Sequence, residues 1–220
     1  MACSHCCGNY GPIGEDITED AFQVAMTYLV DSGQTYITLG GGEPTLHPKF
    51  WQLLGVALSF AHTDDLNLGL ITNGSQTQTA LALANIAQSA DSLLHVSLSQ
   101  DDFHDPIDSR VVRAFERLGG AYTGDRFNSH IRRTVWTSVV PLGRAAKWGP
   151  NKRARICGCG GPYIAYDGKL WVCGCQTVQL GTVFAPDQLD LEALEGEWPC
   201  SESPEMDKAV IIQHRQPALL

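Results

Sequence analysis

The stretch Tyr36-Ile-Thr-Leu39 is followed at once by Gly40-Gly41-Gly42-Glu43-Pro44. Its first four residues are mostly apolar or β-branched, so they predict a short buried strand. The glycines that follow remove side chains from the carboxyl end of that strand and let a ligand approach the backbone. No Lys-Ser or Lys-Thr pair follows, as a Walker loop requires, and the glycine spacing is not that of a Rossmann site. The stretch therefore predicts a strand that ends in a ligand-binding loop; a strained turn without a ligand is the alternative.

Predicted strands and helices alternate along the chain as far as residue 140. Further strands are expected at 66–72, 93–99 and 131–140, and helices are expected to begin near Thr18, Pro48, residue 77 and Ser109. This alternation predicts an α/β fold with parallel strands joined by right-handed crossovers. Both a flat Rossmann-like layer and a curved partial barrel satisfy the pattern.

Two cysteines near the start of the chain are spaced as a C-x-x-C turn. They are Cys3 and Cys6, in the stretch Met1-Ala-Cys-Ser-His-Cys-Cys-Gly8. Such a turn lets both sulfurs face one soft metal ion or cluster, as in iron–sulfur and zinc sites. It also occurs in redox dithiols, so the spacing alone leaves the chemistry open.

Together, the cysteine turn and the strand that ends in Gly-Gly-Glu-Pro resemble the radical S-adenosylmethionine (radical SAM) superfamily. The resemblance implies an open partial (β/α) TIM-type barrel. It also implies a 4Fe-4S cluster held by cysteines spaced C-x-x-x-C-x-x-C, of which Cys3 and Cys6 match the second and third. In the family, the glycine loop binds the amino group of S-adenosyl-L-methionine. The residues to which the resemblance gives this role are Gly41, Gly42, Glu43 and Pro44.

The family's first cysteine would lie two positions before Met1, and the family's first strand would precede it as well. Three explanations are open. We expect that the natural chain begins upstream of Met1 and that a cysteine is encoded two codons before it. Alternatively, Cys7 supplies the third thiolate, or the chain is a decayed copy that acts as a non-catalytic metal-binding or interaction module.

Polar residues also end the next two predicted strands. Asn73 ends one strand, and Ser97 and Ser99 end the next. The resemblance implies that these side chains lie beside the cofactor; an ordinary Asn-Gly turn and hydroxyls bonded to their own backbone are the alternatives. We expect the register of the strand to decide which serine faces the cofactor. A polar loop follows at residues 101–104, where a metal or substrate site is the alternative.

A second cysteine cluster flanks a predicted hairpin. Asp167-Gly168, between apolar and aromatic residues, is a strong turn signal. The turn would bring four thiolates together at the base of the hairpin, those of Cys157, Cys159, Cys173 and Cys175. Four convergent thiolates predict an auxiliary iron–sulfur cluster or a zinc site, with loose thiols as the third alternative. The arrangement also resembles the SPASM and twitch accessory domains of radical SAM enzymes, although the later cysteines of a full SPASM motif are missing.

The chain has 220 residues and a net charge of −9, with a pI near 5.1. An acidic chain is a poor general ligand for phosphate backbones, so we do not expect nucleic-acid binding. No apolar run is long enough to span a membrane. Most of the eight cysteines stand in close pairs that suit metals better than disulfides, which predicts a reducing, cytoplasmic compartment.

We therefore predict three segments: a radical SAM core at 1–143, a cysteine-rich SPASM- or twitch-like region at 144–200, and a tail at 201–220. The resemblance implies an oxidoreductase-type enzyme. A one-electron donor would reduce the cluster, S-adenosylmethionine would be cleaved reductively, and the resulting 5′-deoxyadenosyl radical would take hydrogen from a substrate. The cofactors carry this chemistry, so we predict no side-chain acid or base. A peptide and a small molecule are both open as the substrate.

Overall fold

The computed structural model describes the following residues: Ser4, Cys6, Tyr10, Gly11, 13–89, 93–101, 103–119, 130–132, Ala145, Lys147, 162–174, Gln176 and 178–195. The chain divides into two compact units. One, called the sheet unit below, spans Gln34–Val135, and the other, the hairpin unit, joins Ala2–Gly33 to Trp136–Leu220. No helix in the described ranges has both the length and the apolar character that a membrane crossing requires.

A four-stranded parallel sheet forms the centre of the sheet unit. Its strands are β1 (Tyr36–Leu39), β2 (Asn67–Thr72), β3 (Leu94–Ser99) and β4 (Ile131–Arg132). They lie in the order β1-β2-β3-β4, so each strand pairs with the next one along the chain. A Rossmann-type sheet reverses its strand order at a switch point, and the four described strands do not. The mixed α/β arrangement is therefore compatible with the partial barrel that the resemblance implies.

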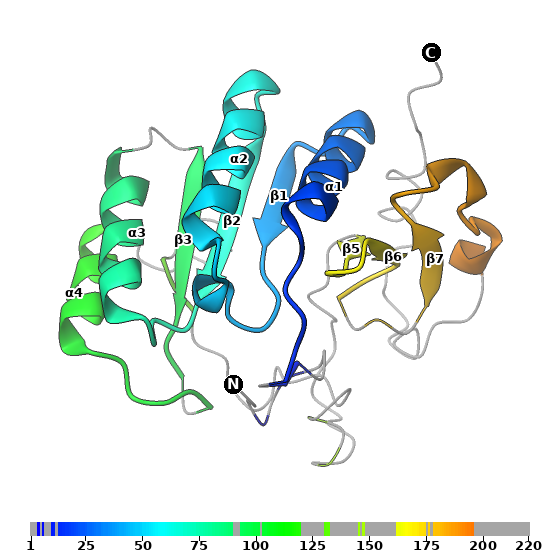
Figure 1. Cartoon of the computed structure of the whole chain (residues 1–220). Coiled ribbons are helices and arrows are strands. Elements are labelled where there is room, and N and C mark those ends of the chain that lie inside the picture. The colour runs from blue at the N-terminus through cyan, green and yellow to red at the C-terminus, as the bar shows by residue number, and fades with distance from the viewer. Residues whose placement is uncertain are drawn as a thin grey trace. The chain divides into compact units, whose positions relative to one another are not determined.

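Three helices connect the strands of this sheet and lie on one of its faces (Figure 1). They are α2 (Phe50–Thr63), α3 (Thr77–Ser89) and α4 (Ser109–Arg117). Each strand is added at the same edge of the sheet as the chain proceeds. Right-handed crossovers then place every connecting helix on the same side of the sheet. The opposite face is therefore free of these three helices.

The core of the sheet unit lies between the helices and the sheet. The strand residues at its centre are at most 1% exposed, namely Leu68, Leu70, Val96 and Leu98. Helix α2 buries residues at helical spacing against them, namely Phe50, Leu53, Leu54, Ala57 and Ala61. Since the buried strand residues are two apart on their strands, this apolar layer occupies one face of the sheet only.

The hairpin unit contains a three-stranded antiparallel sheet. Its first strand, β5 (Tyr163–Ile164), turns into β6 (Lys169–Trp171), which pairs with β7 (Gln179–Thr182). The turn lies where the Asp-Gly signal predicts it. Gly168 has a φ of 75°, and a Cβ there would overlap the ring of Phe184, so a larger residue does not fit. Two 3-10 segments follow, Pro186–Gln188 and Glu192–Glu195.

Helix α1 (Glu19–Asp31) belongs to the hairpin unit. It begins where the sequence predicts, because Thr18 Oγ1 accepts a hydrogen bond of 3.2 Å from the Ala21 N–H. Val24 and Tyr28 of this helix pack on a buried apolar cluster of the hairpin sheet, which consists of Leu170, Val172, Leu180 and Val183. The helix thus joins the first part of the chain to the C-terminal sheet.

Candidate functional site

The carboxylate of Glu43 joins the ends of two strands in the sheet unit. Its Oε1 accepts hydrogen bonds from the Thr45 N–H at 3.2 Å, the Thr45 hydroxyl at 2.7 Å and the Thr72 hydroxyl at 2.8 Å. Its Oε2 accepts one from the Asn73 N–H at 2.7 Å. Glu43 directly follows the glycines after β1, and Thr72 ends β2. The side chain therefore holds the glycine loop against the carboxyl end of the neighbouring strand.

This network leaves part of the Glu43 carboxylate available to a ligand. A carboxylate offers about four acceptor positions, two on each oxygen. The four hydrogen bonds that it accepts from the described part of the chain are divided unevenly, with three on Oε1 and one on Oε2. Oε2 therefore has room for one more donor, such as the ammonium group of an amino acid.

The glycine loop beside Glu43 presents open backbone. Gly41 has a φ of 129°, a conformation that residues with a side chain rarely adopt. A Cβ added at Gly40 or at Gly41 would meet no heavy atom of the described residues within 4 Å, so these two positions are open on that side. Pro44 then starts a 3-10 turn, Pro44–Leu46, for which Glu43 is the N-cap. The loop and its carboxylate fit the amino end of S-adenosylmethionine, and this is the group that the residues would hold.

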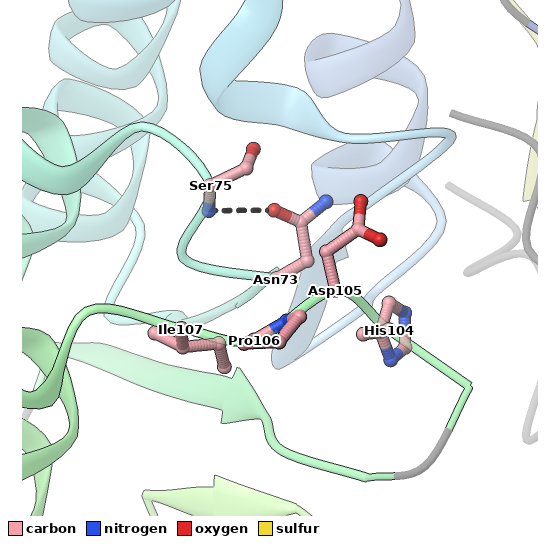
Figure 2. A pocket seen from close by; sticks show the side chains of 6 residues that line it. All are labelled: Asn73, Ser75, His104, Asp105, Pro106 and Ile107. Carbon is pink, nitrogen blue, oxygen red and sulfur yellow. Dashed lines mark hydrogen bonds between the residues drawn. The ribbon is translucent and has the colours of Figure 1, made fainter.

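Asn73 connects this network to a pocket at the same edge of the sheet. Asn73 is 7% exposed, and its Oδ1 accepts a hydrogen bond of 2.8 Å from the Ser75 N–H. Figure 2 shows the Asn73 amide, the Asp105 carboxylate and the His104 ring around the pocket, with Pro106 and Ile107 as its apolar lining. The Asn73-Gly74 turn is thus present, as one of the two alternatives predicts. Asn73 also lines a pocket, and its N–H donates to Glu43.

His104 is held in place by a buried carboxylate. Its Nδ1 lies 2.7 Å from Asp101 Oδ1, and the two side chains are 11% and 1% exposed, respectively. The Phe103 N–H also donates to Asp101 Oδ1, at 3.0 Å. Since a carboxylate only accepts, the proton of this bond belongs to His104 Nδ1. The polar loop after β3 is therefore an ordered Asp–His couple whose imidazole lines the pocket.

Ser97 and Ser99 both lie on β3, but the prediction that register selects one of them is wrong. Residues two apart on a strand point to the same face, so the two hydroxyls share one face of the sheet, opposite to Leu98. Leu98 belongs to the helix-covered layer, beside α4: a Cβ at Gly74 would meet both Leu98 and Val111. Ser97 is 5% exposed and Ser99 is half-buried, on the face that α2, α3 and α4 leave free.

Two of the six predicted metal ligands lie within the described residues, and both belong to the hairpin unit. Cys6 is half-buried, and Cys173, two residues after β6, is 7% exposed. The other four lie outside the described residues, namely Cys3, Cys157, Cys159 and Cys175. Within the described ranges, no three Cys, His, Asp or Glu side chains come close enough to hold a metal ion.

Cys6 is hydrogen-bonded to Ala145 and lies near two half-buried tyrosines, Tyr10 and Tyr163. Its carbonyl oxygen accepts a hydrogen bond of 3.4 Å from the Ala145 N–H. Gln176 Nε2 donates to the Tyr10 hydroxyl at 3.1 Å, and the Tyr10 ring centre lies 6.5 Å from that of Tyr163 on β5. Burial raises the pKa of both phenols, and a negative charge on Cys6 would raise them further, so both hydroxyls stay protonated at neutral pH.

Sequence reasoning missed Thr72 and Thr45, which hold Glu43. The signal for Thr72 is its place at the end of a strand next to Asn73, where the carboxyl ends of parallel strands meet. Thr45 gives no signal of its own, because it binds Glu43 only through the 3-10 turn that Pro44 starts.

Comparison with known proteins agrees with this geometry. The family model described as the radical SAM superfamily matches residues 1–126, a stretch that includes the cysteine turn, the glycine loop and the first three strands of the sheet. No curated protein matches the sequence. Because the match covers more than half of the chain, the protein belongs to the radical SAM superfamily.

Proposed function

We propose that this protein is a radical SAM enzyme that cleaves S-adenosyl-L-methionine reductively and uses the product to take hydrogen from a substrate. Family membership supports the general class. The observation that carries the proposal is the Glu43 network, which fixes the glycine loop and leaves one acceptor position on Oε2. A loop built only for a turn would have no need of a carboxylate tied to the neighbouring strand.

Each predicted residue has a role in this proposal. Cys3 and Cys6 would hold the 4Fe-4S cluster through their thiolates. The loop Gly41–Pro44 would hold the amino group of the cofactor. Asn73, Ser97 and Ser99 would line the remaining part of the cofactor site. When bound, the cluster and S-adenosylmethionine together supply a 5′-deoxyadenosyl radical, and the protein supplies orientation and the exclusion of water.

The direct test is anaerobic reconstitution with iron and sulfide, followed by S-adenosylmethionine and dithionite as the electron donor. We expect the protein to release 5′-deoxyadenosine. Cys6→Ser should abolish both this product and the iron bound at the first cluster, apart from any iron held by the second cysteine site. The matched variant Cys7→Ser should keep both if the third thiolate lies elsewhere, and lose both if Cys7 supplies it. A chain that takes up iron but yields no 5′-deoxyadenosine would instead be the non-catalytic metal-binding module.

The cysteines of the hairpin unit form a second site in this proposal. Cys173 supports it, because it is buried directly after the hairpin that the Asp-Gly turn closes. With Cys157, Cys159 and Cys175 it would hold an auxiliary iron–sulfur cluster or zinc in a SPASM- or twitch-like region. Metal analysis of Cys173→Ala should show the loss of that metal while the first cluster remains. An unchanged iron and zinc content would reject the second site.

The remaining parts of the proposal rest on sequence pattern. The paired cysteines favour a reducing, cytoplasmic location, where a one-electron donor would reduce the cluster. The SPASM-like cysteines make a peptide one candidate substrate, and a small molecule is an equal candidate. The acidic charge of −9 argues against nucleic acid as a partner.

A further inference from the structure

The face of the four-stranded sheet that α2, α3 and α4 leave free is polar. Strand register places Thr38, Gly69 and His95 side by side on it, with Ser97 opposite Ile71 one step further on. At the carboxyl end, Ser99 pairs with Arg132. Since alternate residues of a strand share a face, these residues lie opposite the apolar layer under the helices. The described strands thus turn hydroxyls, imidazoles and a guanidinium to the side where the barrel interior is expected.

Contacts across strands confirm that these side chains share the face. A Cβ at Gly69 would lie against the Tyr36 hydroxyl oxygen and 3.1 Å from Thr38 Oγ1, so the Tyr36 phenol crosses over the bare backbone of β2. The positive charge of Arg132 acts on the same hydroxyl, although Tyr36 is on β1 and Arg132 on β4. Arg132 therefore lowers the pKa of the Tyr36 phenol, against the larger effect of burial.

Two stacked histidines lie on this face next to Arg132. The rings of His95 and His130 are 4.5 Å apart and 28° from parallel. His130 Nδ1 lies 2.7 Å from the Val96 carbonyl oxygen, which only accepts, so Nδ1 carries a proton. This bond fixes the ring and its tautomer. His130 directly precedes β4, and its ring stacks on that of His95 on β3.

We propose that this face binds an oxyanion of the substrate, a carboxylate or a phosphate group, with Arg132 as its principal cation. A guanidinium binds both oxygens of such a group through parallel hydrogen bonds. The proposal names the substrate class of the radical chemistry proposed above and rests on it. Charge supports it: the chain is acidic overall, yet the strand residues on this face include no carboxylate. His130 precedes Arg132 by two residues in the sequence and is the next candidate donor.

The test uses the full chain with labelled histidines, and inorganic phosphate as the probe. Imidazole resonances are followed during a phosphate titration at constant ionic strength, with chloride as the balancing anion. We expect phosphate to shift the His95 and His130 signals but not those of His62, which is exposed on α2. Arg132→Gln should weaken phosphate binding by about tenfold or more, as the loss of a charged hydrogen-bond partner implies. The matched variant Arg113→Gln, exposed on α4, should bind as the wild type does.

Saturation with S-adenosylmethionine separates two sources of the oxyanion. If the site serves the substrate, the phosphate response persists with the cofactor bound. If the cofactor suppresses the response, the site holds the cofactor's own carboxylate and the proposal is overturned. It is also overturned if phosphate shifts all histidines alike, shifts none, or acts equally on Arg132→Gln. If no 5′-deoxyadenosine forms, the enzyme proposal is rejected. The phosphate titration does not depend on that reaction and still tests the oxyanion site.

Discussion

The Glu43 carboxylate accepts a hydrogen bond of 2.7 Å from the main-chain N–H of Asn73, thirty residues further along the chain. The bond joins the loop after β1 to the turn after β2. Because strand pairing alone does not order the loops beyond the strand ends, this contact sets the shape of the cofactor edge. Glu43 thus acts as a structural link between the two strand ends, in addition to the ligand-binding role that we propose for it.

Replacing Glu43 by Gln should destabilise the sheet unit and weaken cofactor binding. An amide group has one oxygen and puts N–H donors where the carboxylate accepted from Thr72 or Asn73, so at least one buried donor loses its partner. We expect the free energy of unfolding to fall by about 1–3 kcal/mol in urea titrations. Equilibrium dialysis should show weaker binding of S-adenosylmethionine. Glu116→Gln, exposed on α4, is the control and should change stability by less than about 0.5 kcal/mol.

Thr72→Val should show that the Thr72 hydroxyl acts through Glu43. Thr72 is 1% exposed, donates to Glu43 Oε1 and accepts from the Gly74 N–H at 3.1 Å. Valine keeps the shape but leaves both partners unsatisfied, at a cost of about 1–3 kcal/mol. Combined with Glu43→Gln, it should cost less than the sum of the two changes, by about 0.5 kcal/mol or more. Strict additivity would contradict the link, and Thr79→Val on α3 serves as the control.

The sequence predicts the elements of this fold better than their contacts. The strands ending at Leu39, Thr72 and Ser99 follow from short, largely apolar runs that stop at Gly, Asn and polar residues, and they are confirmed. The Asp167-Gly168 hairpin follows from turn chemistry that is local in sequence. Local signals of this kind need no knowledge of neighbouring strands.

The contacts that shape the site depend on register, which the sequence pattern does not give. The partnership of Glu43 with Thr72 requires β1 and β2 to be parallel neighbours with aligned ends. The packing of Tyr28 on the hairpin sheet joins segments more than a hundred residues apart, so helical spacing cannot reveal it. Both contacts follow from tertiary structure rather than from local preference.

Gly69→Ala should destabilise the sheet unit, since the added methyl group would overlap the Tyr36 hydroxyl. We expect a loss of about 1–3 kcal/mol, as for other overpacked positions. Adding Tyr36→Phe should restore part of this loss, because the hydroxyl oxygen is the nearest atom. Gly55→Ala on α2 is the matched control: nothing lies within 4 Å, so it should stabilise by about 0.5–1 kcal/mol. Equal effects at the two glycines would contradict the close approach of Tyr36.

Tyr36 should also make the protein sensitive to alkaline pH. Burial raises the pKa of its phenol above the ordinary value of 10.0, and Thr38 and Arg132 offset this only in part. Between the unfolded and the folded pKa, the folded chain binds more protons, so stability falls as pH rises. The stability that the protonated Tyr36 phenol contributes is thus complete below the ordinary pKa of 10.0, and it is lost as the pH rises through the higher pKa of the folded state. The stability difference between wild type and Tyr36→Phe should shrink as pH rises from about 9 to 11, and a difference that stays constant over this range would contradict the effect of the buried phenol.

Asp101→Asn should change the protonation pattern of His104 without unfolding the pocket. In the wild type the Asp101 carboxylate requires a proton on His104 Nδ1, because it accepts and cannot donate. An asparagine amide can donate to Nδ1 instead, which would move the proton of the neutral ring to Nε2. Nitrogen NMR of labelled histidine distinguishes the two tautomers. Asp105→Asn, which lines the same pocket but is exposed, should leave the His104 tautomer unchanged. If both variants kept the wild-type signal, Asp101 would not position His104, and the imidazole would be a passive part of the pocket wall.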